Sequence, residues 1–242
     1  MSVPSNSILS RLIVACVLAA SAYGQDAAVI GPYVQDVRST AATICWATRS
    51  GETKLTGPSG ESIVREYSMH KTVLPRLKPG TKYQYSVEAD GNVPLTGEFT
   101  TFPEKDEPFR FVVFGDTRSR HEIHARLVKR IADEKPLFVI NTGDLVSDGR
   151  SMADWEKFFE VSGGLMRTIP YYPVLGNHEN DSQHYYDFFC LPGNERYYTF
   201  HAGGVLFLML DTEGPEVEVP AYVPEAEEDV FVTEQLRPYM ET

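Results

Sequence analysis

Three apolar segments of this chain each end in a glycine followed at once by an oxygen-bearing side chain, and this repeat restricts the folds available to it. The three side chains are Asp116, Asp144 and Asn177. Stretches with the apolar spacing of helices separate the segments, so strands and helices alternate and predict an α/β layered fold. Because ligands in such sheets gather at the carboxyl ends of the strands, we expect the three side chains to converge.

The chemistry of these side chains favours a metal site. His178 directly follows Asn177, so two carboxylates, an amide and an imidazole are predicted at one edge of the sheet. Oxygen and nitrogen donors of this kind suit divalent and trivalent cations. A single aspartate at the end of a strand could instead cap the next helix, but three such segments together favour a shared site.

The preceding residues, 25–103, have the pattern of an all-β domain. Residues 42–47 and 82–88 alternate apolar side chains with others, which predicts strands with one buried face. Frequent Gly and Pro turns between short strands indicate a β-sandwich. Trp46 and the Leu, Pro-Gly and Tyr pattern of residues 77–85 resemble a fibronectin type III domain with its tyrosine corner. The charged residues 104–108 are expected to form the linker to the next domain.

Residues 109–242 carry a second and stronger resemblance. The Gly-Asp pairs ending at Asp116 and Asp144, and the Gly-Asn-His-Glu run of residues 176–179, resemble the first three signature blocks of the calcineurin-like metallophosphoesterases. Purple acid phosphatases belong to that superfamily, and residues 31–35 resemble the start of their N-terminal sandwich. The implied fold is a fibronectin III-like β-sandwich followed by an α/β layered metallophosphoesterase domain that is apparently truncated.

That resemblance implies a mechanism and two metal ions. Asp144 would bridge two divalent or mixed-valence ions of Fe, Zn or Mn, Asp116 would bind the first ion, and Asn177 the second. A metal-bound hydroxide would then hydrolyse a phosphorylated small-molecule substrate. His178 would contact the phosphoryl oxygen or protonate the leaving group.

The first two blocks also depart from the family's pattern. Arg118 stands where many relatives have a histidine ligand and purple acid phosphatases have glycine. An arginine cannot ligate a cation, so Arg118 is a candidate for gripping the substrate phosphate or, alternatively, a structural or solvent-facing side chain. Ser147 stands where purple acid phosphatases have a tyrosine ligand, which argues against a purple Fe(III) enzyme.

The positions of the histidines indicate whether the implied metal site has all its ligands. The family has further histidine ligands after its fourth strand, whereas the last histidine of this chain is His201, so the metals are expected to be incompletely bound. The chain is therefore interpreted as a truncated enzyme or as a degenerate, non-catalytic relative that serves as a binding or adhesion module. His121, His124 and His184 are weaker candidates for the missing ligands, with a solvated helix face as the default for the first two.

The N-terminus and the overall charge bound the location and the partners. Residues 1–24 have the pattern of a signal peptide, which predicts a secreted or periplasmic protein without stable membrane insertion. A formal net charge of −12 argues against nucleic acid as a partner. After cleavage before Gln25, Cys45 and Cys190 remain. A disulfide between them stays open, but two small core thiols are favoured.

Overall fold

The computed structural model describes residues 15–16, 28–56, 62–88, 94–104 and 107–211. Most of the predicted signal peptide and the whole acidic stretch after Asp211 lie outside these residues. Among the described segments, no helix combines the length and apolar character needed to cross a bilayer.

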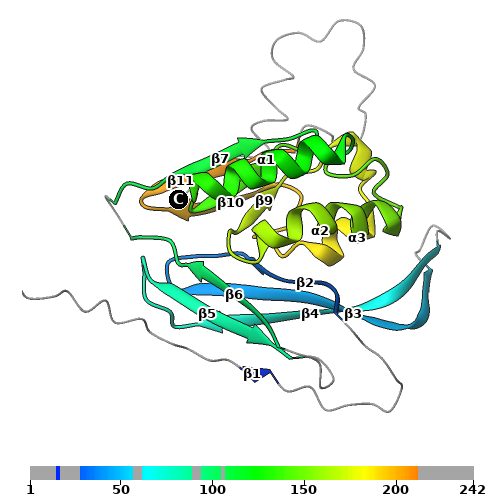
Figure 1. Cartoon of the computed structure of the whole chain (residues 1–242), viewed down its shortest axis with the longest axis horizontal. Coiled ribbons are helices and arrows are strands. Elements are labelled where there is room, and N and C mark those ends of the chain that lie inside the picture. The colour runs from blue at the N-terminus through cyan, green and yellow to red at the C-terminus, as the bar shows by residue number, and fades with distance from the viewer. Residues whose placement is uncertain (1–14, 17–27, 57–61, 89–93, 105–106, 212–242) are drawn as a thin grey trace, which may run out of the picture.

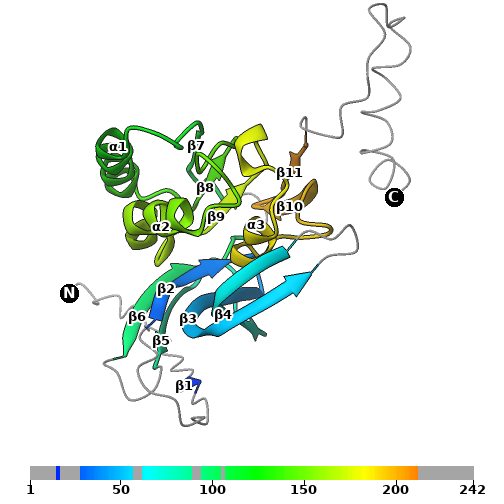
Figure 2. The ribbon, with the colours of Figure 1, turned by 90° about the vertical axis from the view of Figure 1, so that its right-hand side faces the viewer.

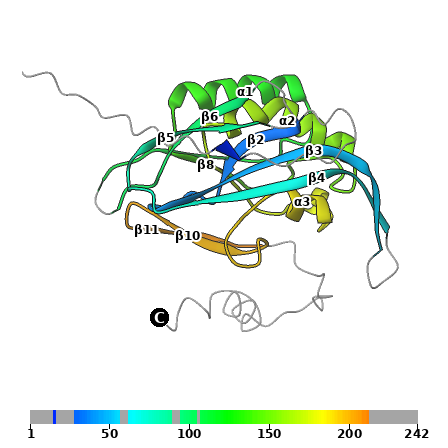
Figure 3. The ribbon, with the colours of Figure 1, turned by 90° about the horizontal axis from the view of Figure 1, so that it is seen from below.

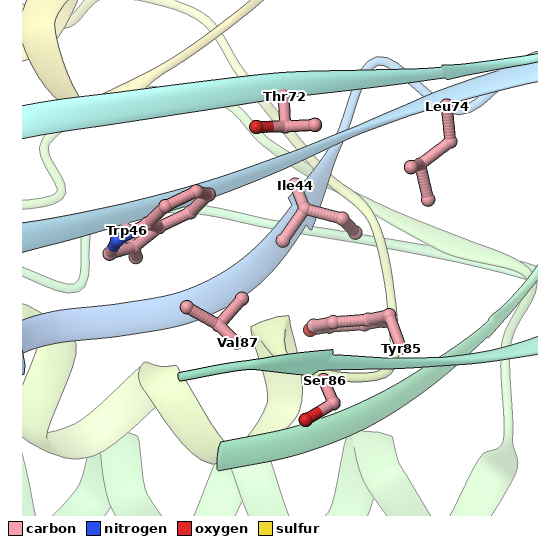
Figure 4. Close-up of a pocket in the computed structure, with 7 residues that line it drawn as sticks. All are labelled: Ile44, Trp46, Thr72, Leu74, Tyr85, Ser86 and Val87. Carbon is pink, nitrogen blue, oxygen red and sulfur yellow. The ribbon is translucent and has the colours of Figure 1, made fainter. Parts of the chain in front are cut away.

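The strands of the N-terminal half form two small sheets. Their bounds are β1 Ala15–Cys16, β2 Ala28–Gln35, β3 Ala41–Thr56, β4 Ser62–Pro75, β5 Lys82–Val87 and β6 Leu95–Thr100. One sheet is antiparallel in the order β2-β3-β4, and the other has the order β1-β5-β6, with β1 parallel to β5. Figure 4 shows side chains of β3, β4 and β5 facing one another between the sheets, around a gap of only ≈ 10 Å³. A gap of that size holds no ligand.

The alternation predicted for these strands is confirmed in β5 and wrong in β3. In β5, Tyr83 and Tyr85 are buried while Lys82 and Gln84 are exposed. In β3, Trp46 and its neighbour Cys45 are both buried, although they point to opposite faces. The reason is that β3 is covered twice, by β5 on one face and by the α/β half of the molecule on the other.

The second half contains a parallel sheet with helices beside it. Its elements are β7 Phe111–Phe114, α1 His121–Glu134, β8 Phe138–Asn141, α2 Met152–Met166, β9 Tyr171–Pro173, the 3₁₀ turn η1 Asn177–Glu179, α3 Gln183–Phe188, β10 Tyr198–Ala202 and β11 Val205–Met209. The sheet order is β7-β8-β9, and all three strands are parallel. Figure 2 shows α1 and α2 together on one side of these strands. The predicted α/β layering is therefore present.

Two details of this half differ from the sequence-based expectation. The alternation of strands and helices does not continue to the last strand, because β11 pairs antiparallel with β10 in a hairpin of its own. In α1, the apolar side chains of Ile123 and Leu127 do not face the core and are 42% and 37% exposed. The buried face of α1 consists instead of His124, Val128 and Ile131, because α2 packs on that side of the helix.

The two halves share one core. The Tyr172 hydroxyl, at the end of the parallel sheet, donates a hydrogen bond to the Val37 carbonyl oxygen at 2.8 Å, and the Gln35 side-chain amide donates to the Tyr171 carbonyl oxygen at 3.2 Å. The buried ring of Phe102 packs against Phe138 of β8. Figure 1 shows the resulting arrangement, with the two sheets that contain β2–β6 below and the α/β half above them. The strands that lead to the candidate ligands are therefore supported from below by the N-terminal sheets.

We predict that Tyr172→Phe lowers the free energy of unfolding by about 1–2 kcal/mol, because it leaves the Val37 carbonyl oxygen without the donor that bridges the two halves. Urea denaturation of both proteins measures the difference. The matched control is Tyr197→Phe, which removes a hydroxyl from a side chain that is only half-buried. Equal stability of the two variants would show that the bond across the halves contributes nothing.

Candidate metal centre

The loops after β7 and β8 continue the pairing of the strands that precede them. The Asp116 N–H donates to the Gly143 carbonyl oxygen at 3.0 Å, and the Thr117 N–H donates to the Asp144 carbonyl oxygen at 2.8 Å. Asp116 and Asp144 both have left-handed backbone conformations, with φ of 55° and 57°. Aspartate is one of the few residues that adopts this conformation readily. The two aspartates thus leave neighbouring strands in matching turns, as the repeat in the sequence predicted.

Two glycines allow the second and third loops to approach each other. Gly143 has φ of +103°, and a Cβ built on it would lie 2.8 Å from the Gly176 Cα. A Cβ on Gly176 would overlap the Asp144 side chain. The glycine in front of each candidate ligand therefore provides room for the neighbouring loop as well as a sharp turn.

Glu179 joins these loops through its buried carboxylate. It accepts hydrogen bonds from four backbone N–H groups, at 2.7 Å from Gly176, 2.8 Å from Asp144, 2.8 Å from Leu145 and 3.2 Å from Val146. Its side chain is wholly buried. Burial raises the pKa of Glu179, and the four N–H groups oppose that rise. This residue received no role in the sequence analysis, although it closes the third signature block; its function depends on backbone donors that no sequence pattern displays.

The Arg118 guanidinium joins the carboxylates of Asp116 and Asp144. A single guanidinium nitrogen of Arg118 hydrogen-bonds both carboxylates. The Asp116 side chain is 73% exposed, the Asp144 side chain 17% and the Arg118 side chain 31%, so the cluster lies at a surface that solutes can reach. The Ser147 hydroxyl fixes the backbone of Arg118 by donating to its carbonyl oxygen at 2.8 Å. The sequence predicted either a phosphate-binding or a structural role for Arg118, and in the structure its guanidinium bridges the two carboxylates.

Asn177 and His178 lie on the turn η1 beside Asp144. The His178 N–H donates to an Asp144 carboxylate oxygen at 3.3 Å. The His178 Nδ1 lies 2.8 Å from the Ser147 carbonyl oxygen, and because a carbonyl only accepts, Nδ1 carries the proton. The Nε2 atom is then the one available to a substrate. Asn177 is exposed, on the turn that this backbone bond ties to Asp144.

The donor set agrees in type with a hard divalent cation. Asp116, Asp144 and Asn177 supply oxygen atoms, and the Arg118 guanidinium shows that the two carboxylates already share one positive charge. Within the described ranges, no group of three or more His, Cys, Asp or Glu side chains is arranged to hold a metal. In donor type, Asp116, Asp144 and Asn177 therefore fit a metal site.

The weaker histidine candidates lie elsewhere. His124 is 3% exposed and packs between α1 and α2, where its Nε2 lies 3.3 Å from the Ser162 hydroxyl, so the expectation of a solvated helix face is wrong for it. His121 is half-buried at the start of α1. His184 lies against β4, with its Nδ1 2.6 Å from the Tyr67 hydroxyl, and does not line the centre. Neither His124 nor His184 therefore takes the place of a missing ligand.

Comparison with known proteins assigns the family. The sequence pattern of the calcineurin-like phosphoesterases matches residues 109–233. The chain belongs to this family. Members of the family use dinuclear metal centres and act on phosphorylated small molecules.

The individual relatives are distant. An uncharacterised protein of Mycobacterium tuberculosis is 27% identical over 181 residues, which cover 61% of this chain and 34% of the relative. Purple acid phosphatase 23 of Arabidopsis thaliana is 26% identical over 185 residues, which cover 59% of this chain and 40% of the relative. A probable inactive purple acid phosphatase 9 of the same plant is 25% identical over 130 residues, which cover 45% of this chain and 19% of the relative. The chain thus spans well under half the length of these relatives.

Two solved structures share the fold. A purple acid phosphatase from yellow lupin seeds superposes with a TM-score of 0.60 and 15% identity, covering 85% of this chain and 48% of the lupin chain. PhoD superposes with a TM-score of 0.57 and 13% identity, covering 80% of this chain and 53% of its own. The likeness covers more of this chain than the family pattern at residues 109–233 does, so it extends into the N-terminal sheets.

We predict that Glu179→Gln destabilises the centre, because the amide group of glutamine would turn a donor towards backbone N–H groups that now share a carboxylate. The expected loss in the free energy of unfolding is about 2 kcal/mol. Hydrogen exchange should also accelerate at the amides of Asp144 and Leu145. Glu160→Gln, at a side chain that is 69% exposed, is the control and should change neither quantity. Unchanged exchange in Glu179→Gln would show that the carboxylate does not hold the loops.

A pH effect follows from the burial of His124, which lowers its pKa to about 4. In the unfolded chain His124 takes up a proton near pH 6.5, whereas in the folded chain it does so only near pH 4. The free energy of unfolding is therefore highest above pH 6.5 and falls as the pH drops from 6.5 towards 4. Between pH 7 and pH 5 this histidine should cost about 2 kcal/mol of stability. Urea midpoints at both pH values measure the loss, and His124→Gln should remove that share. His201→Gln, at an exposed position, should keep the wild-type dependence on pH.

Proposed function

We propose that this chain carries metal ligands of a metal-dependent phosphoesterase site that hydrolyses phosphate esters in the manner of an acid phosphatase. The observation that carries the proposal is the meeting of Asp116 and Asp144 at one cation, at the carboxyl ends of two adjacent parallel strands. Asp116, Asp144 and Asn177 are the residues we assign to the metals. A bound pair of Fe, Zn or Mn ions supplies positive charge to the phosphoryl oxygens and lowers the pKa of water.

The residues around the proposed metals have roles of their own. His178 presents Nε2 because Nδ1 is held by the Ser147 carbonyl oxygen, and in its charged form Nε2 donates a proton to a phosphoryl or leaving-group oxygen. The Arg118 guanidinium can leave the two carboxylates and bind the substrate phosphate instead, with two parallel hydrogen bonds. The buried carboxylate of Glu179 keeps the loops in place without touching substrate.

The N-terminal half is proposed to be a fibronectin III-like module spanning residues 25–103, linked by residues 104–108 to a phosphoesterase domain at residues 109–242. In support, the Lys78 N–H donates to the Tyr83 hydroxyl at 2.8 Å, which is the hydrogen bond of a tyrosine corner. The signal-like residues 1–24 support the proposal of an exported, secreted or periplasmic protein.

A second candidate is a non-catalytic relative that serves as a binding or adhesion module. Two observations favour it: the Arg118 guanidinium already bridges both carboxylates, and the described part of the chain adds no third acidic, His or Cys ligand. In this alternative, Arg118 stabilises the loops permanently and the centre takes up no metal.

Hydrolysis of p-nitrophenyl phosphate by the full chain, with Mn²⁺, Zn²⁺ or Fe²⁺ added, separates the two candidates. We predict metal-dependent turnover that falls at least about 100-fold in Asp144→Asn, since that change removes the charge assigned to both metals. Asp133→Asn, at an exposed position on α1, is the control and should keep full activity. Absence of turnover, together with no metal retained after dialysis, would instead support the non-catalytic relative.

A further inference from the structure

A row of three side chains crosses the sheet β2-β3-β4 on the face that meets the α/β half. Cys45 of β3 is paired with Tyr33 of β2 on one side and with Lys71 of β4 on the other. Residues directly opposite in neighbouring strands point to the same face, so the three side chains lie side by side. Figure 3 shows α3 beside this sheet. We refer to Tyr33, Cys45 and Lys71 as the docking row.

Each member of the docking row contacts the end of α3 or the residues that follow it. The Tyr33 hydroxyl donates to the Phe188 carbonyl oxygen at 2.5 Å. The Lys71 ammonium group donates to the carbonyl oxygens of Tyr186 and Phe189, at 3.3 and 3.0 Å. Between these two anchors, the Cys45 thiol is hydrogen-bonded to the Cys190 thiol.

We propose that Cys45 and Cys190 form a disulfide bond that joins the N-terminal sheets to the α/β half. Both are free thiols in this structure, and they are in contact although they come from opposite halves of the chain. The anchors on either side of the pair hold the backbone after α3 against the sheet next to Cys45. The inference is independent of the proposed function, because it uses none of the residues assigned to the metals.

The surroundings of the two sulfur atoms determine which thiol reacts first. Cys190 is partly exposed, and its hydrogen bond with Cys45, aided by the charge of Lys71, lowers its pKa to about 7 against the opposing effect of burial. Cys45 is wholly buried, and burial raises its pKa. Cys190 is therefore the thiol that reacts first, and Cys45 the one that resolves the intermediate.

The oxidant we assign is a low-molecular-weight disulfide of the glutathione class. The Cys190 thiolate attacks one sulfur of that disulfide, its sulfur–sulfur bond breaks, and one glutathione leaves as a thiolate. The Cys45 thiol gives its proton to a glutathione thiolate and attacks the Cys190 sulfur, which breaks the mixed disulfide and releases the second glutathione. The protein loses two electrons, and the oxidant gains them as two thiols.

The first test uses the reduced full chain treated with oxidised glutathione, followed by mass spectrometry of peptides from a non-reducing digest. We expect a linked peptide pair that contains Cys45 and Cys190. We also expect the oxidised protein to melt about 5 °C or more above the reduced protein, since the cross-link restricts the unfolded chain. A bond to Cys16, a lasting glutathione adduct on Cys190, or two unreacted thiols in the folded protein would each overturn the proposal.

Single variants test the order of the reaction. Cys45→Ala should stop at one glutathione on Cys190, whereas Cys190→Ser should take up none at Cys45. Cys16→Ser is the matched control and should retain both the linked peptides and the rise in Tm. If Cys45→Ala fails to fold, the partly exposed Cys190→Ser variant and the wild-type digest still decide the question. Glutathione on Cys45 in Cys190→Ser would contradict the assigned order.

Discussion

The carboxylate of Glu179 is the interaction on which the candidate centre depends. A buried carboxylate without hydrogen bonds is costly, and here four backbone N–H groups from two loops satisfy it. Because Gly176 and Asp144 donate to the same oxygen atom, the loop after β8 cannot move away from the loop after β9 without breaking that bond. The ligand-bearing turns are therefore fixed by the backbone, while the side chains of Asp116 and Asn177 stay exposed to solvent.

The electrostatics of the centre follow from the same arrangement. Neighbouring strand ends place Asp116 and Asp144 close enough to share one partner, and two carboxylates at that separation repel each other unless a cation lies between them. In this chain, Arg118 provides that charge from a position two residues after Asp116. A divalent cation can take the same place only if the guanidinium withdraws, and a substrate phosphate offers it an alternative partner. The position of Arg118 thus distinguishes the two proposed functions, since the phosphoesterase requires the guanidinium to withdraw and the non-catalytic relative retains it.

The sequence predicted those features that a local pattern encodes. Glycine before Asp116, Asp144 and Asn177, each after an apolar strand, was enough to predict the α/β layers and the meeting of the two aspartates. The doubly buried strand β3, the buried His124 and the backbone donors of Glu179 were not predicted. Each of these features depends on contact with a segment far away in the chain. The spacing of apolar residues along a strand or helix shows only whether one face is apolar, so it does not reveal such contacts. Thr43 shows the limit clearly, because its alternation with Ala42 and Ile44 implied a solvent-exposed face, yet its side chain is 3% exposed.

The docking row and the candidate centre are connected through α3. At the C-terminal end of the helix, Tyr33 and Lys71 hold the carbonyl oxygens of residues 186, 188 and 189. At its N-terminal end, the Ser182 hydroxyl donates to the Gly149 carbonyl oxygen, and the Gly149 N–H donates to the His178 carbonyl oxygen at 2.8 Å. The sheet β2-β3-β4 is therefore linked through α3 and these two hydrogen bonds to His178, the residue proposed to contact phosphate. The N-terminal half therefore belongs to the framework of the centre, because Gly149, which is hydrogen-bonded to His178, is also hydrogen-bonded to the N-cap of α3, and the sheet holds the other end of α3.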